Sequence, residues 1–245
     1  HPWLLQDGGK MSKSKGNVLY ADDLVSVYGV DAVRYYVLDD MPCDNDGLIG
    51  WQLMTDKING DLANVYGNLV KRTIAMSEKY FDGIVERSGV TELVDEELKS
   101  QAATAYGKVC AFMDEFRISD AIDVVFALLR RANKYVDETA PWVLAKDEAT
   151  HPRLKEVLYN LTETIAIAAS LLAPFMPETS AKVLSQINCE EREYAALGEF
   201  GLYPDGNKVS ENAEVIFARL DGAEVIKKAE EIKNKYAAAA EKAEK

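Results

Sequence analysis

The sequence has no long apolar segment, no clustered cysteines and no excess of basic residues. Its longest apolar run, residues 165–176, is shorter than the roughly 18 uncharged residues that a membrane-spanning helix needs. We therefore expect no membrane partner. The cysteines, Cys43, Cys110 and Cys189, are far apart and only two histidines accompany them, which argues against a zinc site or a disulfide framework. We expect no bound metal and a reducing, cytoplasmic location.

The charge balance excludes a protein that coats nucleic acid. The 245 residues carry a formal net charge of -13, whereas binding driven by phosphate groups needs a basic surface. Any contact with nucleic acid must therefore be local. The chain is long enough for one core and a small appended unit. It starts without an initiator methionine and without a signal-peptide pattern, so we expect a fragment of a longer protein.

Hydrophobic spacing divides the chain near residue 57. Residues 1–57 mix short apolar runs with turns, which is compatible with both strands and short helices. From residue 58 onward the spacing is helical. We expect helices at about 61–80, 95–116, 119–137, 152–173 and 223–245, a short helix after Pro177, and a loop or hairpin within 189–220. Ser119 is the expected cap of the third helix, and the fourth is the expected central buried helix.

A polar loop near the amino terminus concentrates residues that suit a polyphosphate. Residues 10–17 contain three lysines, two serines and a glycine. Ammonium groups and hydroxyls on such a flexible segment can bind phosphate oxygens. A solvated basic loop remains the alternative that composition alone leaves open.

The order of these residues resembles a known signature. The run Lys-Met-Ser-Lys-Ser from Lys10 to Ser14 is similar to the signature loop of class I aminoacyl-tRNA synthetases. This resemblance implies that Lys10 and Lys13 are catalytic and hold the β- and γ-phosphates of ATP, which Mg²⁺ accompanies, and that Ser12 and Ser14 complete the ATP site. Residues 28–36 resemble the stretch that follows this loop in several synthetases, and we interpret their tyrosines as structural support.

The first long helix indicates which synthetase family the chain resembles. Residues 61–72 are similar to the helix that opens the anticodon domain of methionyl-tRNA synthetases. Asn64, Asn68 and Arg72 follow one another at four-residue spacing and share one helix face. An amide offers a donor and an acceptor to a base edge, and a guanidinium can bond to or stack on an unpaired base. The resemblance implies that Asn68 and Arg72 read the CAU anticodon, although an ordinary wet helix face fits the same residues.

A proline and a tryptophan complete the expected anticodon site. Pro141 cannot continue a helix and favours an extended Ala140, so Trp142 should lie at a helix terminus. A tryptophan in the core is the alternative. The resemblance implies that Trp142, presented by Pro141, stacks on an anticodon base. Arg130, Arg131 and Lys134 could supply a local positive patch nearby.

These observations together predict a mainly α protein. A small mixed α/β segment, residues 1–57, would carry the loop, and residues 58–245 would form the α-helical anticodon-binding domain with a carboxy-terminal helix. The sequence has no nucleotide-binding fold, so we expect the chain to bind neither ATP nor methionine by itself and to be inactive alone. Its expected partner is methionine tRNA. A sibling synthetase for valine, isoleucine, leucine or cysteine, or a helical protein-interaction module, would share part of the pattern.

Overall fold

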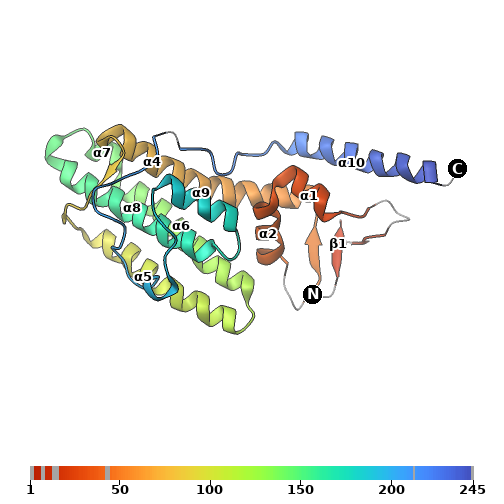
Figure 1. The fold of residues 1–245 in the computed structure, drawn as a ribbon, viewed down its shortest axis with the longest axis horizontal. Helices are drawn as coiled ribbons and strands as arrows, with labels where there is room; N and C mark the ends of the chain where they lie inside the picture. Colours follow the sequence, from red (N-terminus) through yellow and green to blue (C-terminus); the bar gives the residue numbers. More distant parts are fainter. Residues whose placement is uncertain (1–2, 7–8, 13–16, 42–44, 212, 244–245) are drawn as a thin grey trace. The chain divides into compact units, whose positions relative to one another are not determined.

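The chain forms two compact units (Figure 1). The computed structural model describes residues 3–6, 9–12, 17–41, 45–211 and 213–243. Unit 1 consists of His1–Leu62 together with Arg219–Lys245, and unit 2 consists of Ala63–Ala218. Packing thus groups the last part of the chain with the amino-terminal unit. The division into residues 1–57 and 58–245 stays a prediction about function.

A small sheet in unit 1 positions the amino-terminal loop. Strand β1 (Leu4–Gln6) lies between β2 (Gly9–Lys10) and β3 (Gly47–Ile49). It pairs antiparallel with β2, where Leu5 faces Lys10, and parallel with β3, where Leu5 faces Leu48. Strand β2 is therefore an edge strand, and Lys10 ends it.

The described part of unit 1 also contains the α-helices α1 (Ala21–Tyr28), α2 (Val30–Asp39), α3 (Trp51–Lys57) and α10 (Gly222–Ala243). Gly29 connects α1 to α2 with a φ of 84°, a conformation that glycine adopts without strain. Helix α10 packs against α3 and α1 and buries Val225. These elements confirm the mixed character expected for residues 1–57.

The helix after α3 widens into a π-helix. This element, η2 (Ile58–Gly67), spans 10 residues, whereas most π-helical segments are single-turn bulges. The Asn59 amide bonds the backbone of Leu220 twice, donating to its carbonyl at 3.0 Å and accepting from its N–H at 2.8 Å. Asp61 accepts a hydrogen bond from Tyr35 at 2.8 Å. Residues of the π-helix therefore bind both α2 and the returning chain.

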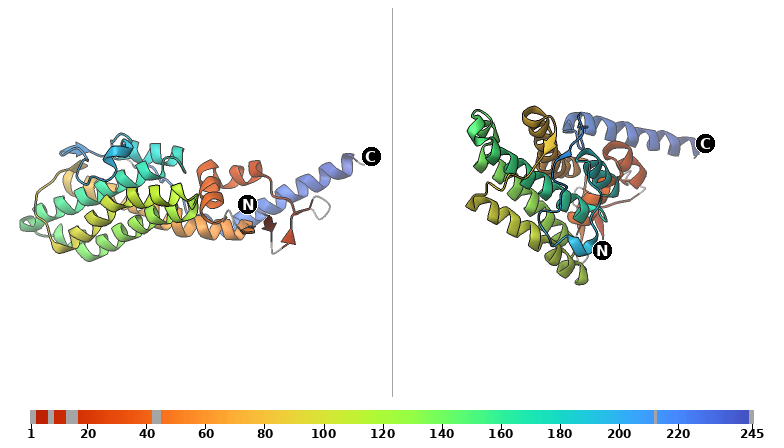
Figure 2. Two further views of the ribbon diagram at one scale, coloured as in Figure 1. Left: turned by 90° about the horizontal axis from the view of Figure 1, so that it is seen from below. Right: turned by 60° about the vertical axis from the view of Figure 1, so that its left-hand side comes forward.

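Unit 2 is a bundle of long helices. Its members are α4 (Asn68–Phe81), α5 (Leu93–Asp114), α6 (Ile118–Thr139), α8 (His151–Leu172) and α9 (Pro177–Gln186). Helices α5, α6 and α8 lie side by side (Figures 1 and 2). Helix α8 is buried on nearly every face from Leu154 onward, which confirms it as the central helix.

Short elements close the bundle. Strand β4 (Ile84–Val85) pairs antiparallel with β5 (Asn207–Lys208), so the segment expected as a loop or hairpin pairs with a distant strand. The others are α7 (Pro141–Leu144) and the single-turn 3₁₀ helices η3 (Glu148–Thr150) and η4 (Tyr194–Ala196).

Two local predictions were wrong. Helix α6 begins at Ile118, and Arg117 rather than Ser119 takes the cap position, because the Arg117 carbonyl already accepts the N–H of Ala121 at 3.1 Å. Ala140 is left-handed, with φ 43° and ψ 64°, rather than extended. Its N–H still donates to the Val136 carbonyl at 3.0 Å, and this bond closes the end of α6.

Candidate functional site

The amino-terminal loop is tied at its base. The Asn17 side chain accepts a hydrogen bond from the Ser12 N–H at 2.8 Å and donates one to the Lys10 carbonyl at 3.4 Å. The N–H of Leu19 donates to the sulfur of Met11 at 3.5 Å. Residues 10–12 are thereby fixed to residues 17–19, the two ends of the segment that carries the signature.

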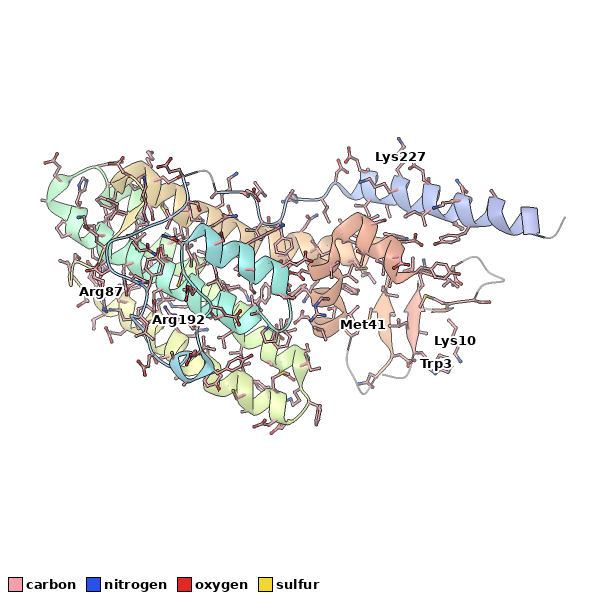
Figure 3. The ribbon with its side chains drawn as sticks, viewed as in Figure 1. Trp3, Lys10, Met41, Arg87, Arg192 and Lys227 are labelled. Atoms are coloured by element: carbon pink, nitrogen blue, oxygen red, sulfur yellow. The ribbon has the colours of Figure 1, made fainter. Side chains whose placement is uncertain are left out.

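Lys10 is exposed and lies against an aromatic ring. Its ammonium nitrogen is 3.8 Å from the ring centroid of Trp3, a cation–π contact (Figure 3). Trp3 is itself 55% exposed, so this contact holds the ammonium group in water. The other predicted members of the ATP site, Lys13 and Ser14, lie outside the described residues.

The tyrosines of residues 28–36 bond to neighbouring elements of unit 1, as expected for structural residues. Tyr35 and Tyr36 are buried, and Tyr36 donates a hydrogen bond to the Leu48 carbonyl of β3 at 3.0 Å. Tyr28 donates to the Trp51 carbonyl at 2.7 Å. Burial raises the pKa of Tyr28 to about 12, so its hydroxyl remains a neutral donor.

A charged network joins α2, α3 and η2. The ammonium nitrogen of Lys57 is 2.7 Å from Asp39 Oδ2 and 3.1 Å from Asp61 Oδ2. Burial alone lowers the pKa of Lys57, but the carboxylates of Asp39 and Asp61 raise it above its ordinary value. The lysine therefore stays charged and holds the two acids together.

The polar face expected on the first long helix is present. Asn64 on η2 and Asn68 on α4 are both exposed, while Leu69 beside them is fully buried. The Arg72 guanidinium is 4.0 Å from Asp137 Oδ1 on α6. The Arg72 side chain is 36% exposed and that of Asp137 72%, so this pair is wet and adds little to stability. The Arg72 head group is thus available for another partner.

Trp142 lies on the same unit and at the surface. It is 44% exposed on the one-turn helix α7, whereas Pro141 before it is buried. Pro141 takes the first helical position, where a missing N–H is harmless. A fully buried tryptophan, the alternative left open by the sequence, does not fit this exposure.

Helix α6, which leads into α7, contacts the polar face of η2 and α4. The Asn133 amide donates to the Val65 carbonyl of η2 at 3.0 Å, and Asp137 faces Arg72 one turn later. Both helices therefore run in the same direction here. Figure 1 shows α7 near the end of α4. Unit 2 accordingly carries the exposed Asn68, the half-buried Arg72 and the exposed Trp142.

Of the predicted positive patch, Arg130, Arg131 and Lys134, the prediction for Arg131 was wrong. Arg131 is buried, with its guanidinium 3.1 Å from Glu97 and 2.9 Å from Glu138. Lys134 is also 3.3 Å from Glu138. Arg131 therefore serves the packing of α5 on α6, and its charge is neutralised.

A buried ion pair joins α5, α6 and α8. Asp95 of α5 is fully buried. It accepts hydrogen bonds from the two terminal guanidinium nitrogens of Arg153 on α8, at 2.6 and 2.8 Å, and from the Tyr135 hydroxyl of α6 at 2.7 Å. Burial raises the pKa of Asp95, but the hydrogen bonds from Arg153, Tyr135 and the Glu92 N–H outweigh it and hold the pKa below its ordinary value. Nothing in the sequence pattern pairs these residues.

A second buried carboxylate organises the long connection after α9. Glu163 of α8, fully buried, accepts the backbone N–H groups of Gly201 at 2.6 Å, Leu202 at 3.1 Å and Tyr203 at 2.8 Å. The guanidinium of Arg192 pairs with the same carboxylate (Figure 3). This cluster anchors a segment that has little secondary structure of its own.

Neither a metal centre nor a membrane span emerges from the described part of the chain. Its histidine, cysteine, aspartate and glutamate side chains form no group of three that could hold an ion. None of its helices is both long and apolar enough to cross a bilayer.

Comparison with known proteins defines the class. A family model described as class I (M) tRNA synthetases matches residues 1–74. A second model, the anticodon binding domain of methionyl tRNA ligase, matches residues 85–241, which is more than half of the chain. The chain therefore belongs to the methionyl-tRNA ligase family of class I tRNA synthetases.

Relatives and solved structures agree with this assignment. The chain is 46% identical to methionine–tRNA ligase of Clostridium perfringens over 95% of its length, and 48% identical to that of Clostridium acetobutylicum, also over 95%. It covers 36% and 35% of those proteins, about a third of their length. Mycobacterium tuberculosis methionyl-tRNA synthetase in complex with methionyl-adenylate is 34% identical, with a TM-score of 0.83 over 89% of this chain and 43% of that one. The resemblance and the mainly α fold class are confirmed.

Proposed function

We propose that this chain reads the CAU anticodon of methionine tRNA. Asn68 and Arg72 would bond to base edges, Trp142 would stack on an unpaired base, and Asn64 and Pro141 would complete the site. The observation that carries the proposal is that one unit presents Asn64, Asn68 and Trp142 at its surface, with Trp142 44% exposed. The half-buried Arg72 pairs with the solvent-exposed Asp137 at 4.0 Å.

The division of labour follows from chemistry. Stacking on an indole tolerates any base, because every base has a π face. Selectivity must come from directional hydrogen bonds, which an amide and a guanidinium supply. The chain's net charge of -13 adds a general repulsion toward tRNA, so a bound tRNA must satisfy the local contacts.

We further propose that the amino-terminal loop holds the phosphates of ATP in the whole enzyme. Lys10 and Lys13 would neutralise the β- and γ-phosphates as methionine attacks the α-phosphate, with Ser12 and Ser14 as further ligands. The exposed Lys10 ammonium and the Asn17 contacts that close the base of the loop support this role. The remaining part of the enzyme would supply the rest of the nucleotide site and would bind methionine and Mg²⁺. We propose that this reaction takes place in the cytoplasm.

A binding comparison tests the anticodon proposal. The chain is titrated with initiator and elongator methionine tRNAs, with valine tRNA, and with a methionine tRNA whose anticodon has been exchanged, at one fixed salt concentration. We expect both methionine tRNAs to bind and the other two to bind weakly. Asn68→Ala should reduce this difference. Thr104→Ala, which changes an exposed polar residue on α5, should leave it intact.

The same comparison can contradict the proposal. Preference for valine tRNA would contradict recognition of the CAU anticodon. Equal and weak binding of all four tRNAs would show that the chain does not read an anticodon by itself.

A further inference from the structure

Helix α7 is too short to hold its own shape. It has one turn, Pro141–Leu144, and isolated helices of that length are unstable in water because nucleation is unfavourable. The last carbonyls of any helix also lack partners within it. Among the described residues, the Trp142 ring makes no stacking or edge contact with another aromatic ring. The position of the indole therefore depends on what holds the α7 backbone.

Thr150, the last residue of η3 and the residue before α8, provides one such contact. The Thr150 hydroxyl donates to the Leu144 carbonyl at 2.5 Å, with the Asp147 carbonyl as a second acceptor at 2.8 Å. Leu144 is the last residue of α7. The threonine thus satisfies a terminal carbonyl of α7 from outside that helix.

His151 provides a second contact and extends it to α4. Its Nε2 lies 3.4 Å from the carbonyl of Ala145, the residue that follows α7. The imidazole meets the ring of Phe81 edge-on, with centroids 5.7 Å apart and an interplanar angle of 88°. Phe81 is the last residue of α4, the helix that carries Asn68 and Arg72. One imidazole therefore contacts both the residue that follows α7 and the end of α4.

We propose that Thr150 and His151 are positioning residues for anticodon recognition, which fix the turn carrying Trp142 relative to α4. The inference rests on the proposed anticodon function. The stacking by Trp142 and the hydrogen bonds from Asn68 and Arg72 must act on neighbouring bases at the same time. If the Trp142 ring moved relative to α4, these contacts would no longer be aligned and selectivity would be lost. Neither residue needs to touch the tRNA.

Two variants and two controls test the proposal. Thr150→Val removes the hydroxyl at nearly constant shape, and His151→Leu removes both the ring and its nitrogen. Thr150→Ser keeps the hydroxyl and should restore the parent behaviour. Thr104→Val removes an equivalent bond, because the Thr104 hydroxyl donates to the Ser100 carbonyl within α5 at 2.9 Å.

The first readout follows the indole without any tRNA. The protein has three tryptophans, and the double substitution Trp3→Phe and Trp51→Phe removes two of them. Tryptophan fluorescence then reports on Trp142 alone. We expect Thr150→Val and His151→Leu to lower its fluorescence anisotropy and to increase its quenching by acrylamide. Thr150→Ser and Thr104→Val should match the parent.

The second readout is tRNA binding, made with the native tryptophans. We expect Thr150→Val and His151→Leu each to weaken methionine tRNA about 3- to 10-fold, as for a lost hydrogen bond, and to leave valine tRNA unchanged. Unchanged anisotropy and unchanged discrimination in both variants would overturn the proposal, as would equal weakening toward both tRNAs. If Trp142→Ala itself keeps full discrimination, the proposed function fails and this inference fails with it. If Trp142→Ala loses discrimination between the tRNAs while Thr150→Val and His151→Leu behave like the parent protein, only the positioning role is refuted.

Discussion

Truncation of Trp142 should affect tRNA selectivity more than folding. An exposure of 44% leaves about 140 Å² of a side chain of roughly 250 Å² hidden. An alanine retains part of that burial, so about 100 Å² of apolar contact is lost. At about 25 cal/mol per Å² this is at most about 2.5 kcal/mol, because the unfolded chain already hides some of this surface. The melting temperature should fall by about 2–10 °C.

The loss in binding arises from a different source. Stacking of one base on an aromatic side chain contributes about 1–3 kcal/mol, which corresponds to about 5- to 150-fold in affinity. The indole is also the platform on which the contacts of Asn68 and Arg72 would be aligned. Trp142→Ala should therefore reduce affinity for methionine tRNA by this amount and leave the weak affinity for valine tRNA nearly unchanged.

The assay pairs thermal unfolding with tRNA binding on the same protein. Phe126→Ala is the matched control, because Phe126 on α6 is only 1% exposed and its truncation should cost about 3–5 kcal/mol of stability. At a temperature where that variant remains folded, its discrimination between tRNAs should persist. A stability loss in Trp142→Ala as large as in Phe126→Ala, or equal weakening toward both tRNAs, would refute the reasoning.

Four further predictions concern the loop and the supporting core. The chain alone should show no methionine-dependent ATP–pyrophosphate exchange, and measurable exchange would contradict the proposed role. In the whole enzyme, Lys13→Ala should slow adenylate formation about 10²- to 10³-fold with little change in methionine affinity, whereas a parallel loss of methionine binding would indicate a ground-state contact. The folded-state pKa of Asp95 is lowered, so the ionised carboxylate stabilises the fold fully above the unfolded pKa of about 3.9, and this stabilisation is lost as the pH falls through the folded pKa. Urea unfolding from about pH 5 to pH 2 should show this loss of stability. Asp95→Asn should make the stability depend less on pH over this range. Glu163→Gln leaves the buried Arg192 without its charged partner and should cost about 3–5 kcal/mol in urea unfolding, and a loss under about 1 kcal/mol would argue against the anchoring role.

The helices could be predicted because their sequence signals are local. Helix α8 was expected at about 152–173 and spans His151–Leu172, and α9 begins at Pro177 as expected. Proline and glycine mark such boundaries, and apolar spacing marks the buried face. The exposure of Asn68 and Trp142 also follows the pattern of residues around them.

Local rules failed where a tertiary or helix-end bond competes with them. The proline rule favours an extended Ala140, yet the bond that closes α6 holds this residue left-handed. The sequence shows no pattern that indicates the π-helical winding of η2. Asn59 and Asp61 of this element bind Leu220 and Tyr35, which lie elsewhere in the chain. Apolar periodicity does not reveal such pairs.

The structure describes some residues of the predicted sites and not others. Structure places the proposed anticodon residues on one unit, but their roles stay predictions, and Lys13 and Ser14 lie outside the described residues. Sequence reasoning missed Thr150, His151 and the pairing of Arg72 with Asp137. These contacts join side chains to a neighbouring turn or helix, and no spacing of residues in the sequence indicates them.

The discontinuity of unit 1 has a consequence for the order of folding during synthesis. The amide of Asn59 binds the backbone of Leu220 across 161 residues of sequence, and helix α10 follows later still. A ribosome releases the continuous unit, Ala63–Ala218, before the final segment of unit 1 emerges. Domains usually complete in the order in which they are translated. Here the unit whose translation begins first is completed last, so the contacts of α10 with α1 and α3 form only after the bundle has emerged.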